Sequence, residues 1–96
     1  MWDIRITRVF AAPRAEVHRA FAAPGQIDAT FTEASGSDLL AGEAGGMRLR
    51  VEFHDEPDDR TRLILIQGPC PAETEGQVRE AWSASFTQLD KVLARH

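Results

Sequence analysis

Most signatures of catalysis, metal binding or nucleic-acid binding are missing from this sequence of 96 residues. Its single cysteine, Cys70, excludes an internal disulfide framework and fits a reducing cytoplasm, which is the location we expect. A net charge of −4 with no basic run argues against nucleic acid or an anionic membrane as a partner. Residues 1–10 carry charges at every second or third position, so we expect neither a signal peptide nor a transmembrane segment there.

Motifs that would hold a metal, a phosphate or a catalytic nucleophile are also missing. The acidic segment 55–59 lacks the glycine and terminal glutamate of an EF-hand loop, and 42–46 lacks the lysine of a phosphate-binding loop. Cys70 lies between two prolines with no nearby histidine, which favours an inert loop thiol. None of the histidines has metal-ligand spacing: His18, His54 and His96. We therefore expect no metal, no cofactor and no catalytic residue, with general acid–base catalysis as the weaker alternative.

Alternating and helical patterns divide the chain into strands and helices. Apolar residues at every second position predict half-buried strands over 3–10, 28–34, 47–54 and 60–67. Pro13 suits the first position of a short helix that ends at residues 23–25, and the glycine-rich segment 35–46 is expected to be flexible. The chain is short enough to form one domain, residues 1–96, with a thin core.

A long helix is predicted from Thr74 to the C-terminus. Thr74 and Gln77 form a T-x-x-Q capping box at its start. Its apolar face then carries one small polar residue, Ser85, which either lets the helix approach the sheet closely or leaves room for a ligand. The members of that face are Val78, Trp82, Ser85, Leu89, Val92 and Leu93, flanked by Ala81 and Phe86.

Three stretches resemble the START-like (SRPBCC) superfamily, and within it the family of the activator of the heat-shock protein 90 ATPase. They are "ITRVFAAPRAEVHRAF", "GGMRLRVEFHDEPDDRTRLILIQGP" and "REAWSASFTQLDKVLA". The resemblance implies an α+β helix-grip fold, in which a curved antiparallel sheet packs on a long C-terminal helix. Several dozen residues of the usual middle strands are missing, so we expect a single shortened START-like domain with about four strands.

The resemblance also implies a cavity between the sheet and the last helix that takes a small apolar or amphipathic ligand. Arg8 lies on the inner parity of its strand, where it could bind a ligand carboxylate or instead mark a bulge or extend past the strand end. The candidate ligand-binding residues are Arg8, Phe31, Leu49, Val51, Leu63, Leu65, Trp82, Ser85 and Leu89.

An assembly of two chains is the second expectation. Ile64 and Ile66 fall on the outer face of their strand, where a solvated sheet should carry polar residues, and the missing strands would leave an edge unpaired. These features predict a homodimer through Ile64 and Ile66, although isolated surface isoleucines are also common. The resemblance adds an alternative function, a co-chaperone-like module whose partner is a chaperone.

Overall fold

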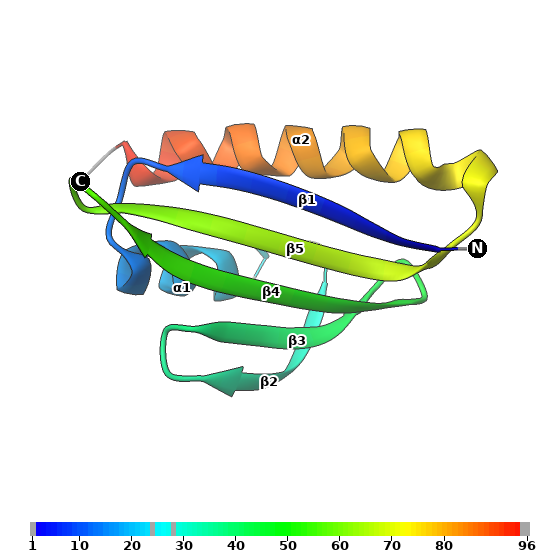
Figure 1. Ribbon diagram of the computed structural model, residues 1–96, viewed down its shortest axis with the longest axis horizontal. Coiled ribbons are helices and arrows are strands. Elements are labelled where there is room, and N and C mark those ends of the chain that lie inside the picture. The colour runs from blue at the N-terminus through cyan, green and yellow to red at the C-terminus, as the bar shows by residue number, and fades with distance from the viewer. Residues whose placement is uncertain (1, 24, 28, 95–96) are drawn as a thin grey trace.

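The computed structural model describes residues 2–23, 25–27 and 29–94. Within them, five antiparallel strands form one sheet in the spatial order β1-β5-β4-β3-β2 (Figure 1). The elements are β1 (Trp2–Phe10), α1 (Arg14–Ala22), β2 (Thr30–Ser35), β3 (Leu39–Ala44), β4 (Met47–Glu56), β5 (Arg60–Cys70), a 3-10 turn (Ala72–Thr74) and α2 (Glu75–Leu93). The predicted α+β helix-grip class is confirmed, with five strands in place of about four.

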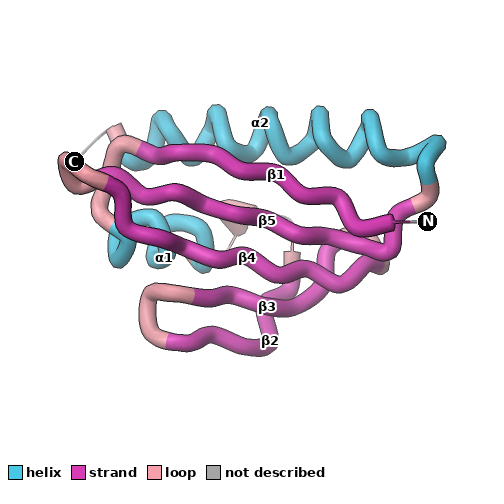
Figure 2. Tube along the Cα trace, in the orientation of Figure 1, coloured by secondary structure: helices cyan, strands magenta, loops and turns pink. Residues whose placement is uncertain are grey.

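Both helices pack on the same face of the sheet. The long α2 runs beside β1 for the length of that strand, and the shorter α1 lies behind the sheet (Figures 1 and 2). An aromatic cluster fills the space between them: the rings of Phe21 and Trp82 stack with centroids 6.1 Å apart, and those of Trp82 and Phe86 at 5.8 Å. No described helix combines the length and the apolarity needed to cross a membrane.

The fifth strand comes from the segment that the sequence predicted to be flexible. Residues 39–44 pair with both β2 and β4, so the expectation for 35–46 was wrong over most of its length. Gly42 explains the error, because a Cβ atom there would lie 1.9 Å from the backbone oxygen of Thr30. Because Gly42 has no side chain, the start of β2 can pass close to β3. The ring centroids of Phe31 and Phe21 lie 5.7 Å apart. Of the strand predicted over 28–34, residue 28 lies outside the described residues.

Two predicted helix starts differ in detail from the structure. Thr74 is the N-cap of α2, but its hydroxyl donates to the carbonyl of Pro71 at 3.0 Å and caps no helical N–H. Its backbone is already helical (φ −102°, ψ −7°) because a 3-10 turn precedes α2, whereas a capping box needs an extended N-cap. Pro13 was predicted at the first position of α1 but is its N-cap, so the helix begins one residue later.

Candidate functional site

A groove of about 200 Å³ lies between α2 and the sheet, where β3 ends, β4 begins and β5 approaches its end. We call it the α2 groove. It sits where the β3–β4 turn meets the N-terminal half of α2, at one end of the sheet (Figure 1). None of its lining side chains is charged: Val78, Ala81, Trp82 and Ser85 come from α2, and Ala44, Gly45, Met47 and Gln67 from the sheet.

Small and polar residues at facing positions keep this groove open. The inner face of β5 is apolar at Leu63 and Leu65 and then changes to Gln67. Opposite, α2 presents Ala81 and Ser85 on either side of Trp82. Apart from Trp82 and Met47, the large apolar side chains that fill the rest of the interface are therefore lacking here.

Gln67 joins its own strand, β5, to two other elements that border the groove, α2 and β3. Its side-chain oxygen accepts the indole N–H of Trp82 at 2.6 Å, and its amide nitrogen donates to the carbonyl of Ala44 at 2.9 Å. Gln67 is only 3% exposed, and buried polar groups are stable only when they are hydrogen-bonded in this way. The amide thus fixes the Trp82 ring as one wall of the groove.

Ser85 is half-buried and contributes a hydroxyl to the lining. If Ser85 only lets the helix approach the sheet closely, its hydroxyl should bond to the backbone carbonyl one turn back. The Thr87 hydroxyl makes such a bond to the carbonyl of Ser83 at 3.0 Å. No described residue forms a hydrogen bond with the Ser85 hydroxyl. The hydroxyl therefore keeps its capacity to donate to, and accept from, a molecule in the groove.

The other apolar candidates fill the core and do not line the groove. Val51, Leu63, Leu65 and Leu89 are completely buried, Leu49 is 2% exposed, and Phe31 is half-buried against Phe21. Within the described part of the chain, the aromatic cluster thus occupies the centre of the sheet–helix interface. The expected central cavity is reduced to the α2 groove, which retains Trp82 and Ser85 from the predicted set. The ligand roles of these residues stay predictions.

Arg8 lies away from the groove and has a partner within the chain. Its guanidinium contacts the carboxylate of Asp90 at 2.5 Å and lies 5.7 Å from the ring centroids of Phe10 and Phe86. This pair holds β1 against the second half of α2, and the Arg8 donors face Asp90. The carboxylate-binding role predicted for Arg8 therefore gains no support from its position.

Gln67 is the most important residue that sequence reasoning missed. A signal was present, because Gln67 continues the inner parity of Leu63 and Leu65 and places an amide on an apolar face. Met47, Val78 and Ala81 had also been assigned to inner or flanking positions, but no sequence pattern brings them together. Their meeting depends on the angle at which α2 crosses the sheet.

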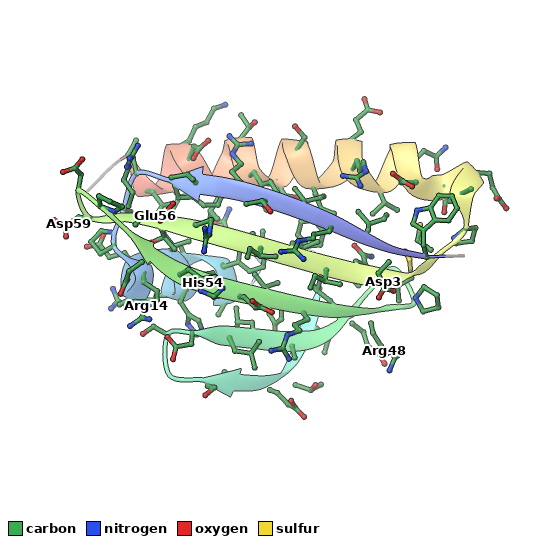
Figure 3. The ribbon with its side chains drawn as sticks, viewed as in Figure 1. Asp3, Arg14, Arg48, His54, Glu56 and Asp59 are labelled. Atoms are coloured by element: carbon green, nitrogen blue, oxygen red, sulfur yellow. The ribbon has the colours of Figure 1, made fainter. Side chains whose placement is uncertain are left out.

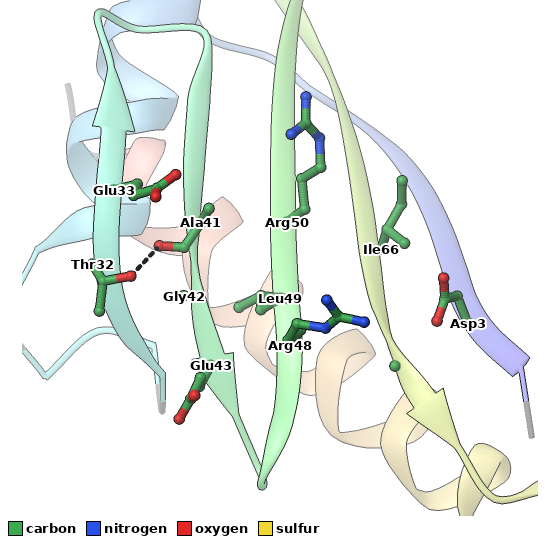
Figure 4. A pocket seen from close by; sticks show the side chains of 11 residues that line it. Asp3, Thr32, Glu33, Ala41, Gly42, Glu43, Arg48, Leu49, Arg50 and Ile66 are labelled. Atoms are coloured by element: carbon green, nitrogen blue, oxygen red, sulfur yellow. Dashed lines mark hydrogen bonds between the residues drawn. The ribbon is translucent and has the colours of Figure 1, made fainter.

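A larger and more open hollow of about 510 Å³ lies on the outer face of the sheet (Figure 4). Its lining includes three residues with little or no side chain, Ala41, Gly42 and Gly68. Its charged residues are of both signs and exposed: Asp3, Glu33, Glu43, Arg48 and Arg50. Figure 3 shows Asp3 and Arg48 at the same end of the sheet. Flexible, hydrated side chains of mixed charge make a poorly organised site, so we favour the α2 groove.

Three hydrogen-bonded polar residues lie along the outer face of β4. Glu52 accepts hydrogen bonds from His54 and from Arg50, each at 3.1 Å. The bond from His54, followed by that from Arg50, lowers the pKa of the Glu52 carboxyl from its ordinary value of 4.5. At the adjoining end of the sheet, Arg14 pairs with Asp38 at 2.6 Å (Arg14 is labelled in Figure 3). These pairs organise the sheet surface and lie outside the α2 groove.

Ile64 and Ile66 lie on the outer face, as predicted, but they differ in exposure. Ile64 sits between Thr7 and Glu52 of the neighbouring strands and is only 8% exposed. Ile66 sits between Arg5 and Arg50 and is half-buried. Ile64 therefore offers little exposed apolar surface to a second chain, and the dimer role of both residues stays a prediction.

No family model and no curated protein matches the chain. Its fold is similar to that of several solved structures. A protein from Chromobacterium violaceum gives a TM-score of 0.76 at 16% identity over 95% of this chain and 96% of that one. The Aha1 dimer from Colwellia psychrerythraea gives 0.76 at 11% identity over 97% and 96%. CalC, a self-sacrificing resistance protein from Micromonospora echinospora, gives 0.71 at 12% identity over 98% and 95%. Because the identities are this low, the structural similarity establishes the helix-grip fold alone.

Proposed function

We propose that this chain is a non-catalytic helix-grip domain that binds one small apolar or amphipathic molecule in the α2 groove. The single observation that carries the proposal is the lining: an indole ring, an unengaged serine hydroxyl and no charged side chain. Ligand sites are mostly apolar concavities with a few placed polar groups, and this groove has that character. The START-like resemblance of residues 6–21, 45–69 and 79–94 and the single buried cysteine further support a shortened START-like domain in the cytoplasm.

The volume of the groove limits the size of its ligand. Pockets for drug-sized molecules measure roughly 300–1,000 Å³, whereas a cavity of about 150 Å³ accommodates benzene. At about 200 Å³, the α2 groove suits a single ring or a short chain. A long fatty acid would project into solvent for most of its length.

Filling the groove from α2 tests this proposal. In Ser85→Leu, the larger side chain should occupy the space between Ala81, Trp82 and Gln67. We expect the indole N–H resonance of Trp82 to shift saturably when toluene, 4-methylphenol or 1-hexanol is added to the unchanged chain, and not in Ser85→Leu. Trp2→Phe assigns the resonance, because the chain has only two tryptophans.

The matched control is Ser83→Leu, which places the same side chain on the exposed side of the same helix. That variant should bind as the unchanged chain does. The proposal is wrong if none of the three compounds shifts the Trp82 resonance saturably, or if Ser85→Leu responds as Ser83→Leu does.

The alternative is a co-chaperone-like interaction module, which the structural likeness to the Aha1 dimer favours. In this reading, the domain forms a homodimer through its outer face at Ile66 and Ile64, and its further partner is a heat-shock protein ATPase. Half-buried Ile66 supplies apolar surface for the dimer. The two edge strands of the sheet, β1 and β2, supply backbone edges with which a second chain can pair.

Sedimentation at micromolar concentration tests the dimer. The unchanged chain and Ala84→Lys, on the exposed side of α2, should sediment as dimers, and Ile66→Lys as a monomer. A monomer mass for the unchanged chain would exclude the dimer. Addition of the domain to purified heat-shock protein 90 should raise the ATPase rate if the chaperone is a partner, and an unchanged rate would argue against it.

A further inference from the structure

We infer that the ligand of the α2 groove is an uncharged single-ring molecule that carries one hydroxyl or carbonyl oxygen, and that the Ser85 hydroxyl bonds to that oxygen. This inference rests on the proposed function and narrows it to a chemical class. A phenol is the simplest example. Charge, hydrogen-bonding capacity and size each limit the ligand independently.

The lining excludes a carboxylate as the preferred headgroup. None of the eight lining residues carries a positive charge. The nearest inner-face cation that the sequence offered, Arg8, is committed to Asp90 and does not contribute to the lining. An ionised group moved into such a groove loses hydration without gaining a counter-charge, so its neutral analogue should bind more tightly.

The hydrogen-bonding groups that remain in the lining match one oxygen atom. The Gln67 oxygen already accepts from Trp82, and one N–H of its amide is used by Ala44. What is left is the hydroxyl of Ser85, which can both donate and accept, and the second N–H of the Gln67 amide. A ligand without any oxygen would leave the Ser85 hydroxyl without a partner when it displaces water.

Ring size follows from the volume and from the wall of the groove. About 200 Å³ holds one substituted ring and little more. Trp82 lines the groove with an aromatic ring whose position is fixed by its bond to Gln67, and aromatic rings pack favourably against each other in edge or offset arrangements. A fused polycyclic ligand would exceed this volume and project into solvent.

Three compounds with the same methyl-substituted ring separate these requirements: toluene, 4-methylphenol and 4-methylbenzoate. Titrated at neutral pH against the unchanged chain, with the Trp82 indole N–H as the readout, 4-methylphenol should bind most tightly and 4-methylbenzoate most weakly. Ser85→Ala should weaken 4-methylphenol about threefold to tenfold, as expected for one lost hydrogen bond, and change toluene affinity by less than about twofold.

The control is Ser83→Ala, which removes an exposed hydroxyl two residues away and should change none of the three affinities. Tighter binding of 4-methylbenzoate or toluene than of 4-methylphenol overturns this inference and leaves the proposed function standing, because a ligand still occupies the groove. Equal 4-methylphenol affinity in Ser85→Ala and the unchanged chain also overturns it. Absence of saturable binding by all three compounds also overturns this inference, and the proposed function fails with it if 1-hexanol does not bind either.

Discussion

The indole N–H of Trp82 donates a 2.6 Å hydrogen bond to the side-chain oxygen of Gln67 and thereby ties α2 to β5 beside the groove. Both residues are nearly buried, at 6% and 3% exposure. A side-chain bond between a helix and a strand of the sheet fixes the helix at one position along its length. It also sets the orientation of the ring that forms the groove wall.

Replacement of Gln67 by leucine should destabilise the fold. The change removes both bonds of the Gln67 side chain and leaves the buried Trp82 N–H without its partner, at a cost of about 1–3 kcal/mol in the free energy of unfolding. Urea unfolding measures it. Gln88→Leu, on the exposed side of α2, should stay within about 0.5 kcal/mol of the unchanged chain. Equal stability of the two variants would show that the bond contributes little.

The Arg8–Asp90 pair should contribute modestly, because its side chains are 32% and 43% exposed. A double-mutant cycle with Arg8→Met and Asp90→Asn should give a coupling free energy of about 0.2–1 kcal/mol, which decreases as salt is added. The Arg8→Met change alone should cost more than Asp90→Asn, since it also removes the guanidinium from the Phe10 and Phe86 rings. A coupling of zero at low salt would contradict this account.

Gly42→Ala should disturb the crossing of β2 over β3. The new Cβ would lie 1.9 Å from the Thr30 oxygen, so the backbone of β2 must move, at a cost of about 1–3 kcal/mol. Gly76→Ala is the matched control: nothing lies within 4 Å of its Cβ position, and alanine favours the helix by up to about 1 kcal/mol. Thermal or urea unfolding should therefore move in opposite directions for the two variants.

Glu52 should make the stability of the sheet depend on pH. Its pKa in the folded chain is lowered, mainly by the hydrogen bond from His54 and then by that from Arg50. A lowered folded pKa contributes stability above the ordinary value of 4.5, and this contribution is lost as the pH falls through the folded pKa. The stability difference between the unchanged chain and Glu52→Gln should therefore be larger at neutral pH than in acid.

Urea unfolding at several pH values measures that difference. Glu80→Gln, on the exposed side of α2, controls for the loss of one negative charge. A stability difference for Glu52→Gln that stays constant from neutral pH into acid would show that the bonds to His54 and Arg50 do not hold in solution.

Local periodicity determined a large part of this fold. Leu49, Val51 and Phe53 alternate with polar residues, and such a pattern can bury its apolar side only as a strand. The same reasoning placed Leu63 and Leu65 on the inner face and Ile64 and Ile66 on the outer one. Helical spacing likewise placed Trp82 and Leu89 on the buried side of α2. These features depend on residues a few positions apart, so the sequence alone contains them.

Contacts between distant segments decided what the pattern could not. Gly42 belongs to a strand because β2 and β4 pair on either side of it, and Asp90 meets Arg8 from 82 residues away. Residue parity placed Ile64 on the outer face, but between Thr7 of β1 and Glu52 of β4 it is only 8% exposed. The groove follows from the same cause: whether Ser85 faces a side chain or a space depends on how the whole helix packs on the sheet, and packing is a property of the assembled elements.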